Sequence, residues 1–118
     1  MDVLIVEDNS ATSRLLVDVL QAARYQCLAV DNAEEGIELA QRHLPRVILM
    51  DINLPGMDGV TATTYLRTLP ALHGTRIIGM SAHALKIEQE LLELSRFDHF
   101  FIKPFSYKQL LEYLAGMR

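Results

Sequence analysis

The sequence has little cysteine, no long apolar run and no excess of positive charge, and each absence excludes a class of protein. Cys27 is the only cysteine among the 118 residues, which fits a reducing compartment better than a disulfide-stabilised secreted domain. No apolar run approaches the roughly 20 residues of a membrane-spanning helix, and no basic leader precedes the first apolar segment. The net charge of −4 opposes direct binding to nucleic acid or an anionic membrane. We therefore expect a cytoplasmic protein.

The chain has the length of one small domain, and half of its residues are hydrophobic. That share is typical of a globular chain with a buried core rather than of a disordered one. No internal repeat, low-complexity stretch or linker-like segment divides the sequence. We therefore predict a single domain over residues 1–118.

Short apolar segments alternate with segments in which hydrophobic residues recur at helical spacing. The apolar segments predict strands, and the segments between them predict helices, three of which follow residues suited to capping, namely Asn9, Asn32 and Ser106. Such alternation favours an α/β fold with a doubly wound parallel sheet and helices on both faces. The expected strands are 2–6, 25–30, 46–50, 76–80 and 99–102, and the expected helices begin near residues 10, 33, 60, 84 and 107.

Three carboxylates stand where expected strands end. Glu7 and Asp8 follow the first strand, and Asp51 follows the third. Because the carboxyl ends of parallel strands meet at one edge of the sheet, these side chains are expected to lie together. Crowded carboxylates repel unless a cation lies among them, and hard oxygen ligands suit Mg²⁺. With the metal in place, Asp51 is a candidate nucleophile toward phosphorus, which would form an acyl phosphate.

The fourth and fifth expected strands lead into Ser81 and Lys103 at the same edge. The Ser81 hydroxyl can donate a hydrogen bond to a phosphoryl oxygen, and the Lys103 ammonium can act on another as a point charge. Either residue alone is common in turns and helix caps. Their placement beside three carboxylates indicates a phosphoryl-transfer site.

Four segments together resemble the receiver domain of two-component response regulators, and the resemblance spans the chain. It implies a flavodoxin-like sheet in the order 2-1-3-4-5 with five helices. It also implies Mg²⁺-dependent, reversible phosphorylation of Asp51 by a histidine kinase or a histidine phosphotransfer protein, with Mn²⁺ able to replace Mg²⁺. The segments are Ile5–Asn9 (IVEDN), Met50–Gly59 (MDINLPGMDG), Met80–Ala82 (MSA) and Phe100–Phe105 (FFIKPF).

The resemblance also implies roles for the residues around Asp51. Asp8, Asp51 and the backbone carbonyl of Asn53 would hold the metal, with Glu7 acting through water. Glu7 stands where many members carry aspartate, and its additional methylene changes its reach. The domain is expected to be no enzyme in its own right, although it would assist its own phosphorylation and dephosphorylation.

Further residues are implied to sense the phosphoryl group. Ser81, in place of the frequent threonine, and Lys103 would contact it, and Phe100 would be the aromatic residue that changes rotamer with phosphorylation. The Lys103–Pro104 peptide bond is usually cis in this family. His83 lies two residues beyond Ser81, where it would gate water approaching the phosphorylated Asp51.

The resemblance places the output on the surface formed by the fourth helix, the fifth strand and the last helix. A downstream protein partner would read that surface. The motif after Ser81 also resembles receivers of phosphorelays, and no output domain is expected within residues 1–118, so a stand-alone protein and a piece of a larger regulator both remain open. Candidate contacts are Lys86, Glu90, His99, Phe101, Lys108 and Tyr113.

Three other functions compete with this interpretation. A phosphohydrolase of the haloacid-dehalogenase type needs a general acid two residues after its nucleophile, but that position holds the amide Asn53. A flavin-binding module of the same topology needs a phosphate loop after the first strand, where Glu7 and Asp8 would repel a phosphate. A receiver-like interaction domain that is never phosphorylated stays as the third alternative, although no acceptor residue is lost.

Overall fold

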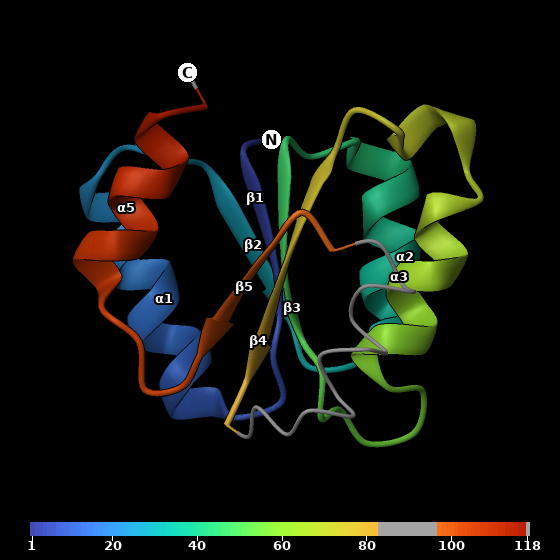
Figure 1. Ribbon diagram of the computed structural model, residues 1–118, viewed down its shortest axis with the longest axis horizontal. Coiled ribbons are helices and arrows are strands. Elements are labelled where there is room, and N and C mark those ends of the chain that lie inside the picture. The colour runs from blue at the N-terminus through green and yellow to red at the C-terminus, as the bar shows by residue number, and fades with distance from the viewer. Residues whose placement is uncertain (83–96, 118) are drawn as a thin grey trace.

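The computed structural model describes residues 1–82 and 97–117, in which five parallel strands form one sheet (Figure 1). The strand order is β2-β1-β3-β4-β5, so the predicted α/β topology is confirmed. β2 begins two residues later than predicted, and β3 and β4 each run one residue further, to Asp51 and Ser81. The strands are β1 (Val3–Val6), β2 (Cys27–Val30), β3 (Val47–Asp51), β4 (Arg76–Ser81) and β5 (His99–Ile102).

Helices cover both faces of the sheet. α1 (Ser10–Ala22) and α5 (Tyr107–Ala115) lie on one face, and α2 (Ala33–His43) and α3 (Gly59–Arg67) lie on the other (Figure 1). A 3₁₀ turn, η1 (Pro70–Leu72), follows α3. The helix predicted near residues 84–95 lies outside the described residues. Within residues 1–82 and 97–117, no helix is long and apolar enough to cross a membrane.

Side-chain caps fix where the helices begin, because the first backbone N–H groups of a helix have no partner inside it. Asn9 accepts a hydrogen bond from Thr12 N, and Asn32 accepts one from Glu35 N. Ser106 caps α5 in the same way, as the sequence predicts. The cap of α3 is Asp58, which was not predicted from the sequence.

Gly36 shows why a poor helix former stands inside α2. A glycine there weakens the isolated helix by about 1 kcal/mol relative to alanine. In the fold, however, a Cβ at this position would lie 2.8 Å from Cγ2 of Val6, too close for van der Waals contact. The glycine therefore lets α2 pack directly against β1.

One hydrophobic core lies on each side of the sheet, because successive side chains of a strand point to opposite faces. Val3 and Ile5 belong to the core under α1 and α5, and Leu4 and Val6 belong to the core under α2 and α3. All four residues of β1 are buried, and so are all five of β3. This packing fixes the central strands, whose carboxyl ends meet at one edge of the sheet.

Candidate functional site

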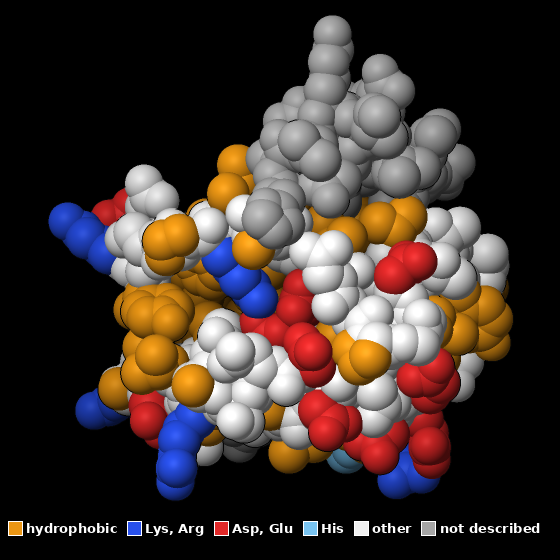
Figure 2. All heavy atoms as spheres, turned by 90° about the horizontal axis from the view of Figure 1, so that it is seen from below, with side chains coloured by type: hydrophobic (Ala, Val, Ile, Leu, Met, Phe, Trp, Pro, Cys, Tyr) orange, Lys and Arg blue, Asp and Glu red, His pale blue; other side chains and the backbone are white. Residues whose placement is uncertain are grey.

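The acidic residues predicted from the strand ends do lie together. One carboxylate oxygen from each of Glu7, Asp8 and Asp51 falls within 4.8 Å of the others. Glu7 and Asp51 are 1% and 4% exposed, whereas Asp8 is open to solvent. Figure 2 looks onto this end of the molecule and shows acidic side chains gathered at its centre, with a basic side chain against them.

Asp51 is held by the turn that follows it. Its Oδ1 accepts a hydrogen bond of 3.0 Å from the backbone N–H of Asn53, and its Oδ2 lies 3.4 Å from Lys103 Nζ. Gly59, the first residue of α3, allows this turn to fold tightly, because a Cβ there would collide with the backbone carbonyl of Asp51. The Asp51 carboxylate is therefore held in place by the turn and by Lys103.

Lys103 follows β5 and reaches two strands, β1 and β3, that are not its neighbours in the sheet. Its ammonium forms an ion pair with the Glu7 carboxylate after β1 and a longer one with Asp51 at the end of β3. The Lys103–Pro104 peptide bond is cis. The direct pair with Glu7 was not predicted from the sequence, which placed Lys103 near the phosphoryl group and Glu7 near the metal.

The surroundings shift the pKa values of Glu7 and Asp51 in opposite directions. Burial, together with the neighbouring Asp51 carboxylate, raises the pKa of Glu7 to about 7. Burial also acts to raise the pKa of Asp51, but hydrogen bonds from Glu7 and the Asn53 amide and the charge of Lys103 outweigh it, so that this pKa is lowered. Asp51 is thus the more acidic member of the pair, and its carboxylate is the form that can act as a nucleophile.

The donor set suits a hard divalent cation. Three carboxylate oxygens approach one another, and Mg²⁺ prefers oxygen ligands while keeping several of its waters. Asp8 is exposed, so a hydrated ion can reach it. Lys103 neutralises only part of the negative charge of the cluster, which leaves a charge that a cation can balance.

Ser81 lies at the carboxyl end of β4, beside this cluster. The side chain of Asn53 donates a hydrogen bond of 3.4 Å to its hydroxyl. Asn53 thereby contacts both Asp51, through its backbone, and Ser81, through its amide. From the sequence, only the Asn53 carbonyl was expected to have a role. The side-chain contact joins residues 28 positions apart, so no local pattern indicates it.

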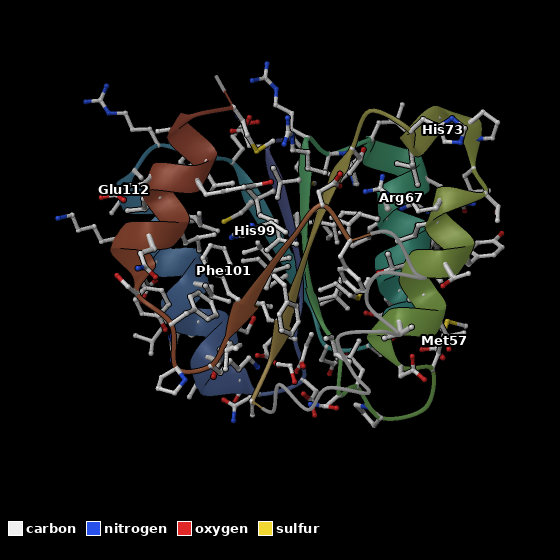
Figure 3. All side chains as sticks on the ribbon, in the orientation of Figure 1. Met57, Arg67, His73, His99, Phe101 and Glu112 are labelled. Carbon is white, nitrogen blue, oxygen red and sulfur yellow. The ribbon has the colours of Figure 1, made fainter. Side chains whose placement is uncertain are left out.

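The two faces of β5 carry different aromatic residues. Phe100 faces the α2 and α3 side, where it pairs with Gly79 of β4. Phe101 lies on the α1 and α5 side with His99, which stacks on Tyr113 of α5 at a centroid distance of 4.6 Å. Figure 3 shows His99 and Phe101 directed toward α5.

Several predicted residues fall outside the part of the chain that the structure describes. These are His83, the candidate water gate, and two of the candidate contacts of the output surface, Lys86 and Glu90. Of the remaining contacts, Lys108 is exposed on α5. Of the three elements predicted to form the output surface, the structure thus describes β5 and α5.

Comparison with known proteins gives a consistent result. Residues 3–115 match a family model described as the response regulator receiver domain. The polar-differentiation response regulator DivK of Brucella anthropi is 33% identical over 110 residues, which cover 93% of this chain and 89% of that protein.

Two solved structures have the same architecture. The receiver domain of a sensor histidine kinase from Pseudomonas aeruginosa, described with a magnesium ion coordinated in its active-site cleft, is 28% identical with a TM-score of 0.90, covering 98% of this chain and 94% of that one. The chemotaxis protein CheY4 of Vibrio cholerae has a TM-score of 0.92 at 23% identity, covering 99% and 98%. At that identity, CheY4 supports the fold alone.

Proposed function

This chain belongs to the response regulator receiver family, and we propose that Asp51 is its phosphoacceptor. Receiver domains are phosphoacceptor switches of two-component signalling and are in general signalling domains rather than enzymes. The observation that carries the proposal is the state of Asp51, a nearly buried carboxylate with a lowered pKa that contacts Lys103 at 3.4 Å.

The proposed reaction transfers a phosphoryl group from a histidine nitrogen to the Asp51 carboxylate. An oxygen of the Asp51 carboxylate attacks the phosphorus of a phosphohistidine, the P–N bond to the donor breaks, and its electron pair stays on the imidazole nitrogen. The lowered pKa keeps Asp51 ionised at neutral pH. The hydrogen bond from Asn53 N holds one carboxylate oxygen, which limits the directions from which the other can attack.

Lys103 and Ser81 flank the place where the phosphoryl group would be attached. Lys103 already lies against Asp51 and can move its ammonium to a phosphoryl oxygen, which would loosen its pair with Glu7. The Ser81 hydroxyl, held by the Asn53 amide, can donate to another oxygen. The same groups can support attack by water on the acyl phosphate, so the chain would also assist its own dephosphorylation.

We propose Asp8, Asp51 and the Asn53 carbonyl as the ligands of Mg²⁺, with Glu7 acting through water, and Mn²⁺ as a substitute. When bound, the metal supplies positive charge that offsets the repulsion between the carboxylates and the incoming phosphoryl group. The support is the cluster of Glu7, Asp8 and Asp51 and the magnesium ion described for the related Pseudomonas receiver.

We further propose that residues 1–118 act as one receiver domain in the cytoplasm. A histidine kinase or a histidine phosphotransfer protein is its phosphodonor, and the domain makes no direct contact with nucleic acid. A downstream protein partner reads the surface that includes β5 and α5. The stacked rings of His99 and Tyr113 support that choice, because aromatic residues are enriched at protein interfaces.

Intact-mass spectrometry tests the central claim. We expect acetyl phosphate and Mg²⁺ to add one phosphoryl group to the protein, and Asp51→Asn to add none. Asp18→Asn makes the same chemical change on the exposed side of α1 and should be labelled normally. Asp8→Asn should need more Mg²⁺ for the same labelling. Equal labelling of Asp51→Asn would show that another residue is the acceptor. No labelling of the unmutated protein would leave an interaction domain that is not phosphorylated.

A further inference from the structure

The amino end of the sheet holds an apolar hollow of about 60 Å³. It lies where β1 and β3 begin, and Figure 1 shows that α5 ends at the same end of the molecule. Val3, Val47 and Leu114 line it and are each at most 3% exposed, and the half-buried Tyr25 and Met117 complete its apolar lining. A water molecule needs about 10–15 Å³ of such space, so the hollow can accept a branched alkyl group of about four carbon atoms.

Arg46 places a positive charge beside the hollow. It belongs to the lining and is exposed, so the hollow reaches the surface there. Arg76 lies next to it, since its backbone N–H donates to the Arg46 carbonyl at 2.9 Å, and its side chain donates to the neutral hydroxyl of Tyr113. In the part of the chain that the structure describes, no carboxylate forms an ion pair with either guanidinium. Both guanidinium groups can therefore attract an anion.

The acidic residue of the lining is turned the other way. The Oδ2 atom of Asp2 accepts a hydrogen bond of 2.7 Å from the backbone N–H of Gln26, which precedes β2. β2 lies on one side of β1, whereas β3, which follows Arg46, and β4, which begins with Arg76, lie on the other. The negative charge of Asp2 is thus displaced from the two arginines, and it does not close the hollow to an anion.

We propose that this hollow binds a small branched-chain carboxylate, with the alkyl group inside the hollow and the carboxylate on Arg46. A guanidinium can donate two parallel hydrogen bonds to a carboxylate. Burial of the alkyl group among Val3, Val47 and Leu114 supplies the hydrophobic contribution. The same chemistry occurs in a free acid and at the carboxyl terminus of a polypeptide that ends in a branched apolar residue. Binding does not depend on Asp51, which lies at the opposite end of β3 from Val47.

NMR of the protein with ¹³C-labelled methionine methyl groups tests the site. We expect 3-methylbutanoate to shift the Met117 methyl resonance, which Met117→Leu identifies, with a dissociation constant of about 1–10 mM. Acetate lacks the branched alkyl group and 3-methylbutanamide lacks the charge, so each should bind about tenfold more weakly or worse. No shift of Met117 at saturating 3-methylbutanoate, or equal shifts with all three compounds, would overturn the proposal.

Arg46→Gln removes the cation beside the hollow and should weaken the binding of 3-methylbutanoate about tenfold or more. Arg14→Gln is the matched control, because it makes the same charge change at an exposed position beside Glu7 and Asp8, at the carboxyl end of the sheet. It should leave binding unchanged, and so should Asp51→Asn, whatever the outcome of the phosphorylation test. Equal weakening in Arg46→Gln and Arg14→Gln would reduce the effect to net charge and overturn the role of Arg46.

Two further compounds distinguish the sources of the carboxylate. N-acetylvaline carries the carboxylate and side chain of a carboxyl-terminal valine. Tighter binding of N-acetylvaline than of 3-methylbutanoate would identify the ligand as a protein carboxyl terminus, and weaker binding would identify it as a free acid. Valine adds an ammonium group to 3-methylbutanoate and should bind more weakly than it, because the Asp2 carboxylate is turned toward Gln26. Tighter binding of valine would overturn the proposed class of ligand.

Discussion

β5 is tied to the rest of the molecule by an ion pair at each end, and the two pairs differ in burial and in balance. Just before the first residue of β5, Asp98 forms an ion pair with Arg67. The Asp98 side chain is 36% exposed and the Arg67 side chain is 14% exposed. After its last residue, Lys103 pairs with Glu7 and Asp51, and the Glu7 side chain is fully buried. One pair joins β5 to a helix, and the other joins it to two strands.

The two ends of β5 differ in how well their charges balance, which distinguishes the structural pair at Asp98 from the functional cluster at Lys103. At the first end, one carboxylate is matched by one guanidinium and one backbone N–H, and Arg67 also donates to the Thr75 carbonyl. At the second end, Lys103 faces the clustered carboxylates of Glu7, Asp8 and Asp51. Such an unbalanced cluster is unfavourable for folding unless a ligand completes it. The imbalance marks the site.

Breaking the buried end should have the largest effect. Lys103→Met removes the ammonium that both buried carboxylates contact, and we expect the free energy of unfolding to fall by about 3 kcal/mol in metal-free buffer at pH 8. Urea denaturation followed by circular dichroism measures the change. Lys108→Met, on the exposed side of α5, should change it by less than about 0.5 kcal/mol. Equal losses would show that the Lys103 pair has no special weight.

Changing the protonation of Glu7, at the buried end, should have the next largest effect on stability. The pKa of Glu7 is raised from 4.5 to about 7, so between these values the folded state binds more protons than the unfolded state. Stability of the metal-free protein should therefore fall as pH rises through this window, by at most about 2–3 kcal/mol. The lowered pKa of Asp51 acts below its ordinary value of 3.8, outside the window.

Glu7→Gln is the control for this pH dependence. It keeps the size of the side chain but cannot ionise, so its stability should vary less between pH 4.5 and pH 7 when measured by the same urea titrations. An identical slope in both proteins would assign the pH dependence to other groups.

Breaking the more exposed end should have the smallest effect. Arg67→Met loses a partly exposed ion pair and a hydrogen bond to Thr75, for which we expect about 1 kcal/mol, and phosphorylation by acetyl phosphate should be retained. Arg42→Met breaks the largely exposed pair with Glu38 and should change stability even less. A loss of labelling in Arg67→Met would show that this end also supports the site.

Strand ends and helix starts were predictable because local signals encode them. Asp51 closes an apolar run, and Asn9 and Asn32 cap the helices that follow them, as short-range spacing indicates. The cap at Asp58 was missed because it stands among turn residues of the same types. The buried seat of Gly36 was missed because it depends on Val6, thirty residues earlier in the chain.

The sequence by itself determined the alternation of strands and helices and the chemical types at the strand ends, since hydrophobic period and capping act within a few residues. Only the tertiary structure decided how those types pair. The contact of Lys103 with Glu7 spans 96 positions, and the ring of Phe100 beside Gly79 comes from the neighbouring strand β5. Such contacts depend on strand order and on the space left between packed side chains, which no local pattern in the chain encodes.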